Sequence, residues 1–146
     1  MKKLFLLCSL PFFCAGLAHA ELNWLTDFEA ARAKAKADNK LLLVDFTGSD
    51  WCGYCIKMDR EVLSKPEFEQ YASKNLVLLE VDFPRAKEQS VALRTQNRKL
   101  AGQYGIEGFP TFIVLDGDGK KVWSYEGYFP GGAGAFIAAL EKIRKS

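Results

Sequence analysis

The chain has 146 residues, of which 49% are hydrophobic and 26% are charged, and its formal net charge at pH 7 is +2. This length suits one domain with a buried core, and no internal repeat or linker interrupts the sequence. So small a charge excludes a strong global attraction to nucleic acid or to anionic membranes. We therefore expect no nucleic acid among its partners. We also expect a monomer.

The first 20 residues have the pattern of an export signal. Two lysines precede an apolar stretch over residues 4–17, and Ala-His-Ala at 18–20 is a small-x-small cleavage site. The apolar stretch is shorter than the roughly 20 residues of a membrane-spanning helix, although retention as an anchor stays open. We predict a cleaved signal peptide over residues 1–20, a domain over residues 21–146, and a periplasmic or secreted location.

Cleavage would change the chemistry that is available. Cys8, Cys14 and His19 would leave with the signal, so the domain would keep two of the four cysteines and no histidine. Two of the 20 basic residues would also leave, and the remaining 18 equal the 18 acidic residues in number. Export would place the two remaining cysteines in an oxidising compartment, where they can form a disulfide.

The domain begins with a predicted helix and a predicted strand. Residues 24–40 carry apolar side chains at helical spacing, beginning with Trp24, Leu25 and Phe28, and lysines lie on the other side. Residues 41–46 then form a near-continuous apolar run, which is typical of a strand buried on both faces.

The central part of the chain predicts three helical segments and a second strand. One helix starts near the cysteine pair and runs through residues 55–63. Residues 64–67, Ser-Lys-Pro-Glu, read as a capping box with proline in the first turn of a further helix. Residues 75–83 have the composition of a buried strand, and residues 87–104 look helical and end near Gly105.

The last part predicts a hairpin followed by a helix. Residues 110–128 read as two strands joined by a tight Asp-Gly turn, and residues 133–146 as a helix. A calcium loop at this turn is excluded because Lys120 and Gly127 occupy ligand positions. The order of elements predicts an α/β fold, with a mixed sheet that has helices on both faces.

Cys52 and Cys55, separated by Gly53 and Tyr54, could be a staple, half of a zinc site or a redox centre. A staple would stabilise little, because the loop that it closes is minimal. Structural zinc needs four ligands, usually Cys or His, and the domain offers two. Redox chemistry is the interpretation that remains. The simpler alternative is an inert reduced pair next to Trp51. We expect no metal and no cofactor.

The spacing of the pair assigns a role to each cysteine. The attacking species in disulfide exchange is a thiolate, which the N-terminus of a helix stabilises. Cys52 would therefore be the exposed nucleophile, and Cys55, one turn further along, the buried resolving thiol. Gly53 would let a partner chain approach closely, and Tyr54 would help to set the reduction potential.

Over residues 40–146 the sequence resembles the thioredoxin superfamily. The segments LLLVDF and WCGYC resemble the central strand and the active-site helix of the family, and QYGIEGFPTFIVLDGDGK resembles its second conserved loop and hairpin. TGSDWCGYC followed by EVLSKPEF is most similar to exported thioredoxin-like proteins and to the periplasmic C-terminal domain of the transmembrane disulfide reductase. The resemblance implies a thioredoxin fold.

The resemblance also implies roles for residues outside the cysteine pair. Pro110 would be a cis-proline facing the cysteines, and Phe109, Pro110 and Thr111 would bind substrate, with the backbone of Phe109 pairing with it. Asp45 would be a buried acid with a raised pKa that exchanges a proton with Cys55. The simpler alternatives are a proline that only opens a strand and a structural, hydrogen-bonded acid.

Three positions depart from the pattern of the family. Asp45 lies one residue further from the first cysteine than in ordinary thioredoxins, and Thr47 stands near a position that is often tryptophan. Where thioredoxins carry a lysine beside the buried acid, the alignment places Leu78. These differences argue against a general reductase of the cytosolic type.

Together these features predict an exported thiol–disulfide oxidoreductase that acts on protein disulfides or dithiols. The resemblance to the C-terminal domain of the transmembrane disulfide reductase favours a reductase that receives its electrons from such a membrane protein. A disulfide oxidase or isomerase, or a non-catalytic thioredoxin-like binding or chaperone module, are the alternatives.

Overall fold

The computed structural model describes residues 22–146. The predicted signal peptide lies outside these residues. Within them, no helix is both long and apolar enough to cross a membrane.

A five-stranded mixed sheet forms the centre of the fold, in the order β1-β3-β2-β4-β5. Its strands are β1 (Trp24–Leu25), β2 (Leu41–Thr47), β3 (Leu76–Asp82), β4 (Thr111–Leu115) and β5 (Lys121–Glu126). The pairs β1–β3 and β2–β3 are parallel, and the pairs β2–β4 and β4–β5 are antiparallel. β2 and β4 are buried along almost their whole length, which explains their continuous apolar sequences.

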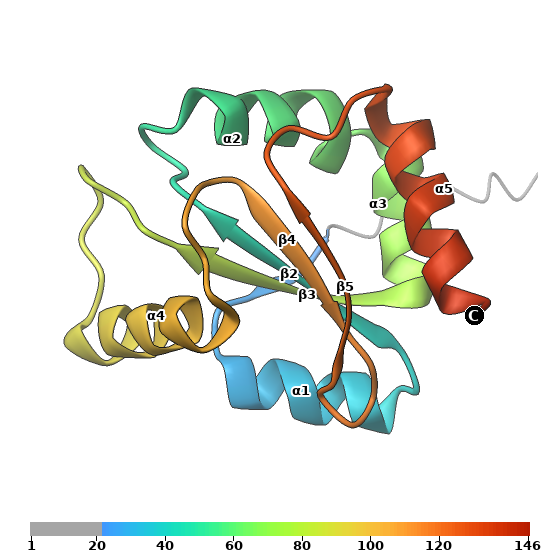
Figure 1. The fold of residues 1–146 in the computed structure, drawn as a ribbon, viewed down its shortest axis with the longest axis horizontal. Coiled ribbons are helices and arrows are strands. Elements are labelled where there is room, and N and C mark those ends of the chain that lie inside the picture. Colours follow the sequence, from blue (N-terminus) through green and yellow to red (C-terminus); the bar gives the residue numbers. More distant parts are fainter. Residues whose placement is uncertain (1–21) are drawn as a thin grey trace, which may run out of the picture.

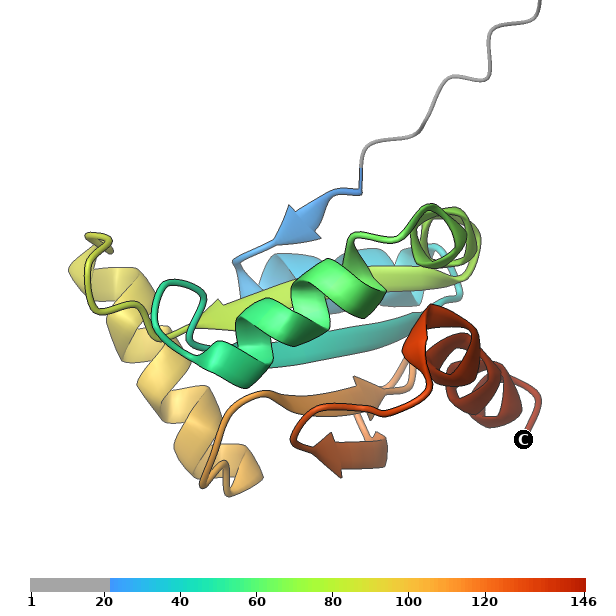
Figure 2. The ribbon, with the colours of Figure 1, turned by 90° about the horizontal axis from the view of Figure 1, so that it is seen from above.

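Helices cover both faces of the sheet, as Figure 1 shows. They are α1 (Phe28–Ala37), α2 (Gly53–Met58), the π-helical turn η1 (Asp59–Leu63), α3 (Pro66–Asn75), α4 (Val91–Tyr104) and α5 (Gly132–Arg144). One core packs α1 and α4 against Leu42, Val44 and Phe46, and the other packs α2, α3 and α5 against Leu43 and Phe112. Figure 2 shows β1 and β5 at opposite edges of the sheet. The predicted α/β thioredoxin fold is confirmed.

The start of the first predicted helix was wrong. Trp24 and Leu25 pair with β3 as a short parallel strand, and α1 begins only at Phe28. Asp27 is the N-cap residue, and its carboxylate accepts the N–H of Ala30 at 2.7 Å. The cap fixes where the helix starts, and the two apolar residues before it pack at the edge of the sheet instead.

Two other helix starts also differ from the prediction. Lys65 is the N-cap of α3 and makes no capping hydrogen bond through its side chain, whereas Ser64 donates its hydroxyl hydrogen bond back to Asp59 at 2.9 Å. Pro66 occupies the first turn as predicted. α4 begins at residue 91 because the hydroxyl of Ser90 accepts the N–H of Leu93 at 3.1 Å. The predicted end at Gly105 is confirmed, with φ of 66° at that glycine.

Candidate active site

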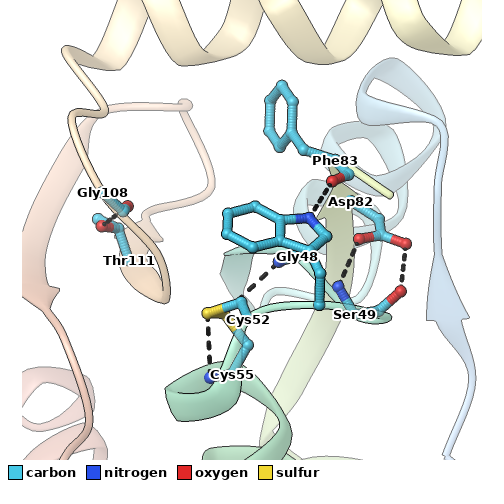
Figure 3. The surroundings of a disulfide bond; sticks show 9 residues. Gly48, Ser49, Cys52, Cys55, Asp82, Phe83, Gly108 and Thr111 are labelled. Atoms are coloured by element: carbon cyan, nitrogen blue, oxygen red, sulfur yellow. Dashed lines mark hydrogen bonds between the residues drawn. A yellow bond between two sulfur atoms is a disulfide. The ribbon is translucent and has the colours of Figure 1, made fainter. Parts of the chain in front are cut away.

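The cysteine pair lies where β2 leads into α2. Cys52 is the N-cap residue of α2, and Cys55 lies one turn into the helix. A disulfide joins them across a Cα–Cα distance of 5.2 Å (Figure 3). The sulfur of Cys52 accepts the N–H of Cys55 at 3.2 Å, so the N-terminus of the helix meets this sulfur. The structure thus places the pair at the helix start that the sequence predicted.

The two cysteines differ little in exposure in this oxidised form. Cys52 is 7% exposed and Cys55 is 4% exposed, so the prediction of an exposed Cys52 is wrong for the disulfide state. Each sulfur is covered by the other, and the sulfur of Cys55 also accepts the N–H of Gly48 at 3.5 Å. The residues between them do face solvent, with Tyr54 65% exposed and open space around Gly53.

The loop before the cysteines is fixed to the end of β3. Ser49 donates through its N–H and its hydroxyl to the carboxylate of Asp82, at 2.9 and 2.6 Å. The indole N–H of Trp51 donates to the carbonyl of Phe83 at 2.8 Å. Lys87 adds a hydrogen bond to the hydroxyl of Ser49 at 3.0 Å. The redox centre therefore rests on two adjacent parallel strands.

Trp51 belongs to an aromatic cluster beside the cysteines. The ring of Phe109 meets Trp51 edge-on at 6.1 Å between centroids and stacks on Phe83 at 5.0 Å. The guanidinium of Arg85 lies 3.7 Å from the centroid of the Trp51 ring, within the range of a cation–π interaction. Sequence reasoning missed Phe83 and Arg85, although their place directly after a buried strand, where sites often form, was a usable signal.

The loop over residues 108–111 lies across from the cysteine pair (Figure 3). The Phe109–Pro110 peptide bond is cis, as the resemblance implied. The carbonyl of Pro110 accepts the N–H of Gly127 at 2.7 Å, and the buried hydroxyl of Thr111 donates to the carbonyl of Gly108 at 2.7 Å. Among the described residues, no hydrogen bond engages the backbone of Phe109. That backbone is therefore free to pair with another chain.

Asp45 is buried on β2, 6% exposed, and its Oδ1 has no hydrogen-bond partner among the described residues. Burial raises its pKa well above the ordinary value, and the neighbouring carboxylate of Glu80 adds to that shift. The register corrects the alignment at this point, because Asp45 pairs with Glu80 while Leu78 pairs with Leu43. Where thioredoxins carry a lysine beside the buried acid, this chain has a second carboxyl group.

Within residues 22–146, no three His, Cys, Asp or Glu side chains form a metal-binding group. A disulfide joins the two cysteines at the start of α2, across from the backbone of Phe109. This arrangement defines the site of a thiol–disulfide oxidoreductase. Residues 28–144 match the thioredoxin-like domain family, and the chain belongs to that family.

Individual relatives narrow the class. The chain is 37% identical over 129 residues to the "Disulfide bond reductase DsbH" of Chlamydia pneumoniae. The aligned residues make up 88% of this chain and 76% of the relative. A solved structure titled "DsbH Oxidoreductase" superposes with a TM-score of 0.81 at 33% identity, covering 99% of this chain and 95% of the other.

The reduced C-terminal domain of DsbD from Neisseria meningitidis superposes with a TM-score of 0.60 at 25% identity, over 79% of this chain and 92% of that domain. The resemblance to thioredoxins is thereby confirmed. The protein is a thioredoxin-like disulfide oxidoreductase with a CxxC-spaced disulfide.

Proposed function

We propose that this protein is an exported disulfide reductase in which Cys52 is the nucleophile and Cys55 the resolving thiol. The observation that carries the proposal is the Cys52–Cys55 pair at the start of α2, across from the loop over residues 108–111. The reducing direction is supported by the 37% identical relative, whose name is that of a disulfide bond reductase.

One turnover begins with the dithiol form. The thiolate of Cys52 attacks one sulfur of the substrate disulfide, so a mixed disulfide forms and a substrate thiolate leaves. Cys55 then loses its proton and attacks the sulfur of Cys52, which releases the second substrate thiolate. Two electrons pass to the substrate, and the two thiolates take up the protons that the enzyme gives away. The Cys52–Cys55 disulfide is the product state of the enzyme.

Substrate would bind as an extended segment beside Phe109. The backbone groups of Phe109 make no hydrogen bond among the described residues, whereas the carbonyl of Pro110 already accepts the N–H of Gly127. Main-chain pairing of this kind tolerates many sequences, because the affinity comes from backbone hydrogen bonds. The open space around Gly53 and the exposed ring of Tyr54 leave room for the substrate on the other side of the sulfurs.

A reductase in an oxidising compartment needs an external source of electrons. The signal-like sequence over residues 1–20 supports export. The superposition on the C-terminal domain of DsbD supports a membrane disulfide reductase as the electron donor. The balanced charge of the domain supports a protein partner rather than nucleic acid, and we propose that the protein acts as a monomer.

Turnover of a disulfide-bonded protein with a small thiol as donor tests the proposal. We expect reduction by residues 21–146, complete loss of activity in Cys52→Ser, and a stable mixed disulfide with substrate in Cys55→Ser. A Cys52→Ser/Cys55→Ser double variant with wild-type activity would contradict dithiol catalysis. Trapping through Cys55 in Cys52→Ser, with none in Cys55→Ser, would reverse the two roles.

A further inference from the structure

A cavity of about 320 Å³ lies against the inner side of the redox pair, and Cys55 is part of its wall. Asp45 and Cys55 are buried members of that wall, whereas Asp59 and Lys87 are exposed. The exposed members mark where the cavity meets solvent. The cavity therefore connects the resolving cysteine with the outside through polar side chains.

Glu80 lies in this cavity beside Asp45. The two residues are partners in the parallel register of β2 and β3, so their side chains lie on the same face of the sheet. Neighbouring strands are about 4.8 Å apart, which brings the two carboxyl groups close together. No arginine or lysine separates them on these strands, because Leu43 and Leu78 form the preceding pair on that face.

Both carboxyl groups hold protons more tightly than usual. Burial is the main reason why the pKa of Asp45 lies well above its ordinary value, and Glu80, Asp59 and Asp82 add to the shift. Burial also raises the pKa of Glu80, with repulsion from Asp82 and Asp59, while Lys87 pulls in the opposite direction. Two neighbouring acids of this kind titrate as a pair and can hold a single proton between them.

We propose that Glu80 takes up the proton that Asp45 receives from Cys55 and passes it to solvent through the cavity. The proton exchange between Asp45 and Cys55 is what the resemblance to thioredoxins implied, and the role of Glu80 is the new inference. The inference rests on the roles of Cys52 and Cys55 proposed above. Asp45, whose buried Oδ1 has no hydrogen-bond partner among residues 22–146, accepts the proton as Cys55 becomes a thiolate and attacks the mixed disulfide. Glu80 acts through Asp45 and is a positioning residue, because it receives that proton and returns Asp45 to its basic form.

The pair makes the attack of Cys55 less dependent on external pH. Without it, Cys55 has to ionise on its own in a buried place, where the charged form is disfavoured. A residue that only supports the fold would slow the reaction by the same factor at every pH. A residue that moves the proton matters most at low pH and is replaced by hydroxide at high pH.

Stopped-flow oxidation of the reduced protein by dithiobis(nitrobenzoate) measures the step directly. Cys8 and Cys14 are either removed with the export signal or replaced by serine, so that only Cys52 and Cys55 react. A first release of thionitrobenzoate, which depends on reagent concentration, reports attack by Cys52. A second release, independent of concentration, reports attack by Cys55.

At pH 7 we expect Glu80→Gln to slow the second release about tenfold, and Asp45→Asn by about 100-fold, because a positioned proton acceptor contributes roughly 10²–10⁴. The first release should not change. The defect should shrink towards pH 9, and Glu80→Asp should restore most of the rate. Glu67→Gln makes the same chemical change at an exposed position on α3 and should behave as wild type.

Three outcomes would overturn the proposal. One is a wild-type second release in Glu80→Gln across the pH range. Another is a loss by one constant factor at every pH, which would assign Glu80 a structural role. If the wild type itself shows no concentration-independent release, the dithiol mechanism fails and the pair fails with it. Matching far-UV circular dichroism of the variants confirms that they are folded.

Discussion

At the scale of single residues, Gly48 permits the packing of Trp51. A Cβ atom at residue 48 would lie 2.6 Å from the indole ring, which is closer than non-bonded atoms approach. The indole cannot retreat without losing its hydrogen bond to Phe83 and its contact with Arg85. The glycine is therefore a requirement of the active-site loop that the motif alone did not reveal.

Gly48→Ala should destabilise the protein by about 1–3 kcal/mol, as is usual for overpacking of a tight site. Urea unfolding measures this loss, and the fluorescence of Trp51 should change with it. Gly102→Ala is the matched control, because a Cβ at that position in α4 would meet no described atom within 4 Å beyond its own chain neighbours and helix backbone. That variant should be more stable by about 0.5–1 kcal/mol. Equal effects of both substitutions would contradict the packing argument.

Asp45 makes a second residue-scale prediction, about pH. Its pKa is raised in the folded state, so the unfolded chain releases this proton first, at about pH 4. Stability from the neutral carboxyl is therefore complete below about pH 4 and is lost as pH rises towards the folded pKa. The stability of the wild type relative to Asp45→Asn should fall over that range. Urea midpoints of the oxidised proteins from pH 4 to 8 test this, and a constant difference would contradict it.

At this scale the sequence predicted the cysteine pair, the loop at Pro110 and the buried acid. It did not predict Glu80 as the neighbour of Asp45, because alignment to a lysine position pointed to Leu78. Residues 78 and 80 are two positions apart, so both side chains lie on the same face of the strand, but they have different partners on β2. Only the register between strands decides that choice.

At the scale of elements, the segment between β3 and α4 is joined to the active-site loop. The carboxylate of Asp50 accepts three consecutive backbone N–H groups, from Arg85 at 2.9 Å, Ala86 at 2.7 Å and Lys87 at 3.0 Å. These bonds lower the pKa of Asp50. They also hold the guanidinium of Arg85 over Trp51. The active site, which lies between β2 and α2, is thus bordered by the segment that connects β3 with α4.

Asp50→Ala should release this segment. We expect the amides of residues 85–87 to exchange with solvent about tenfold faster or more, because hydrogen bonds to a charged acceptor are roughly twice as strong as neutral ones. Hydrogen-exchange NMR measures this. Asp118→Ala removes an exposed acid whose carboxylate lies 3.9 Å from the ammonium of Lys36, and it should leave these amides unchanged. Unaltered protection in Asp50→Ala would show that other contacts hold the segment.

The elements themselves were predictable where composition was decisive. The apolar runs of β2, β3 and β4 and the Asp-Gly hairpin were found, as was the end of α4 at Gly105. Helix starts were less predictable, since one capping side chain decides them: Asp27 moved the start of α1, and Ser90 that of α4. Two apolar residues before a cap carry no sign of whether they begin a helix or an edge strand.

At the scale of the whole molecule, two cores on either side of one sheet hold the redox centre in place. The face that carries Leu43 and Phe112 also carries Asp45 and Glu80, so the proton path and one core share a surface. The fold and the class of enzyme could be predicted from the sequence. The strand before the cysteines, the CxxC motif and the loop at Pro110 follow one another in the order that is found in the thioredoxin superfamily. The direction of electron flow could not, because it depends on a free-energy difference between two forms of the same pair.

The reduction potential of the Cys52–Cys55 pair tests the central claim, that the protein is a reductase. Equilibration of the protein with reduced and oxidised glutathione or dithiothreitol, read from Trp51 fluorescence or alkylation, gives the value. A reductase predicts a potential near or below about −270 mV, and each 30 mV corresponds to about 1.4 kcal/mol for this two-electron couple. A potential near about −120 mV would contradict the account and identify an oxidase.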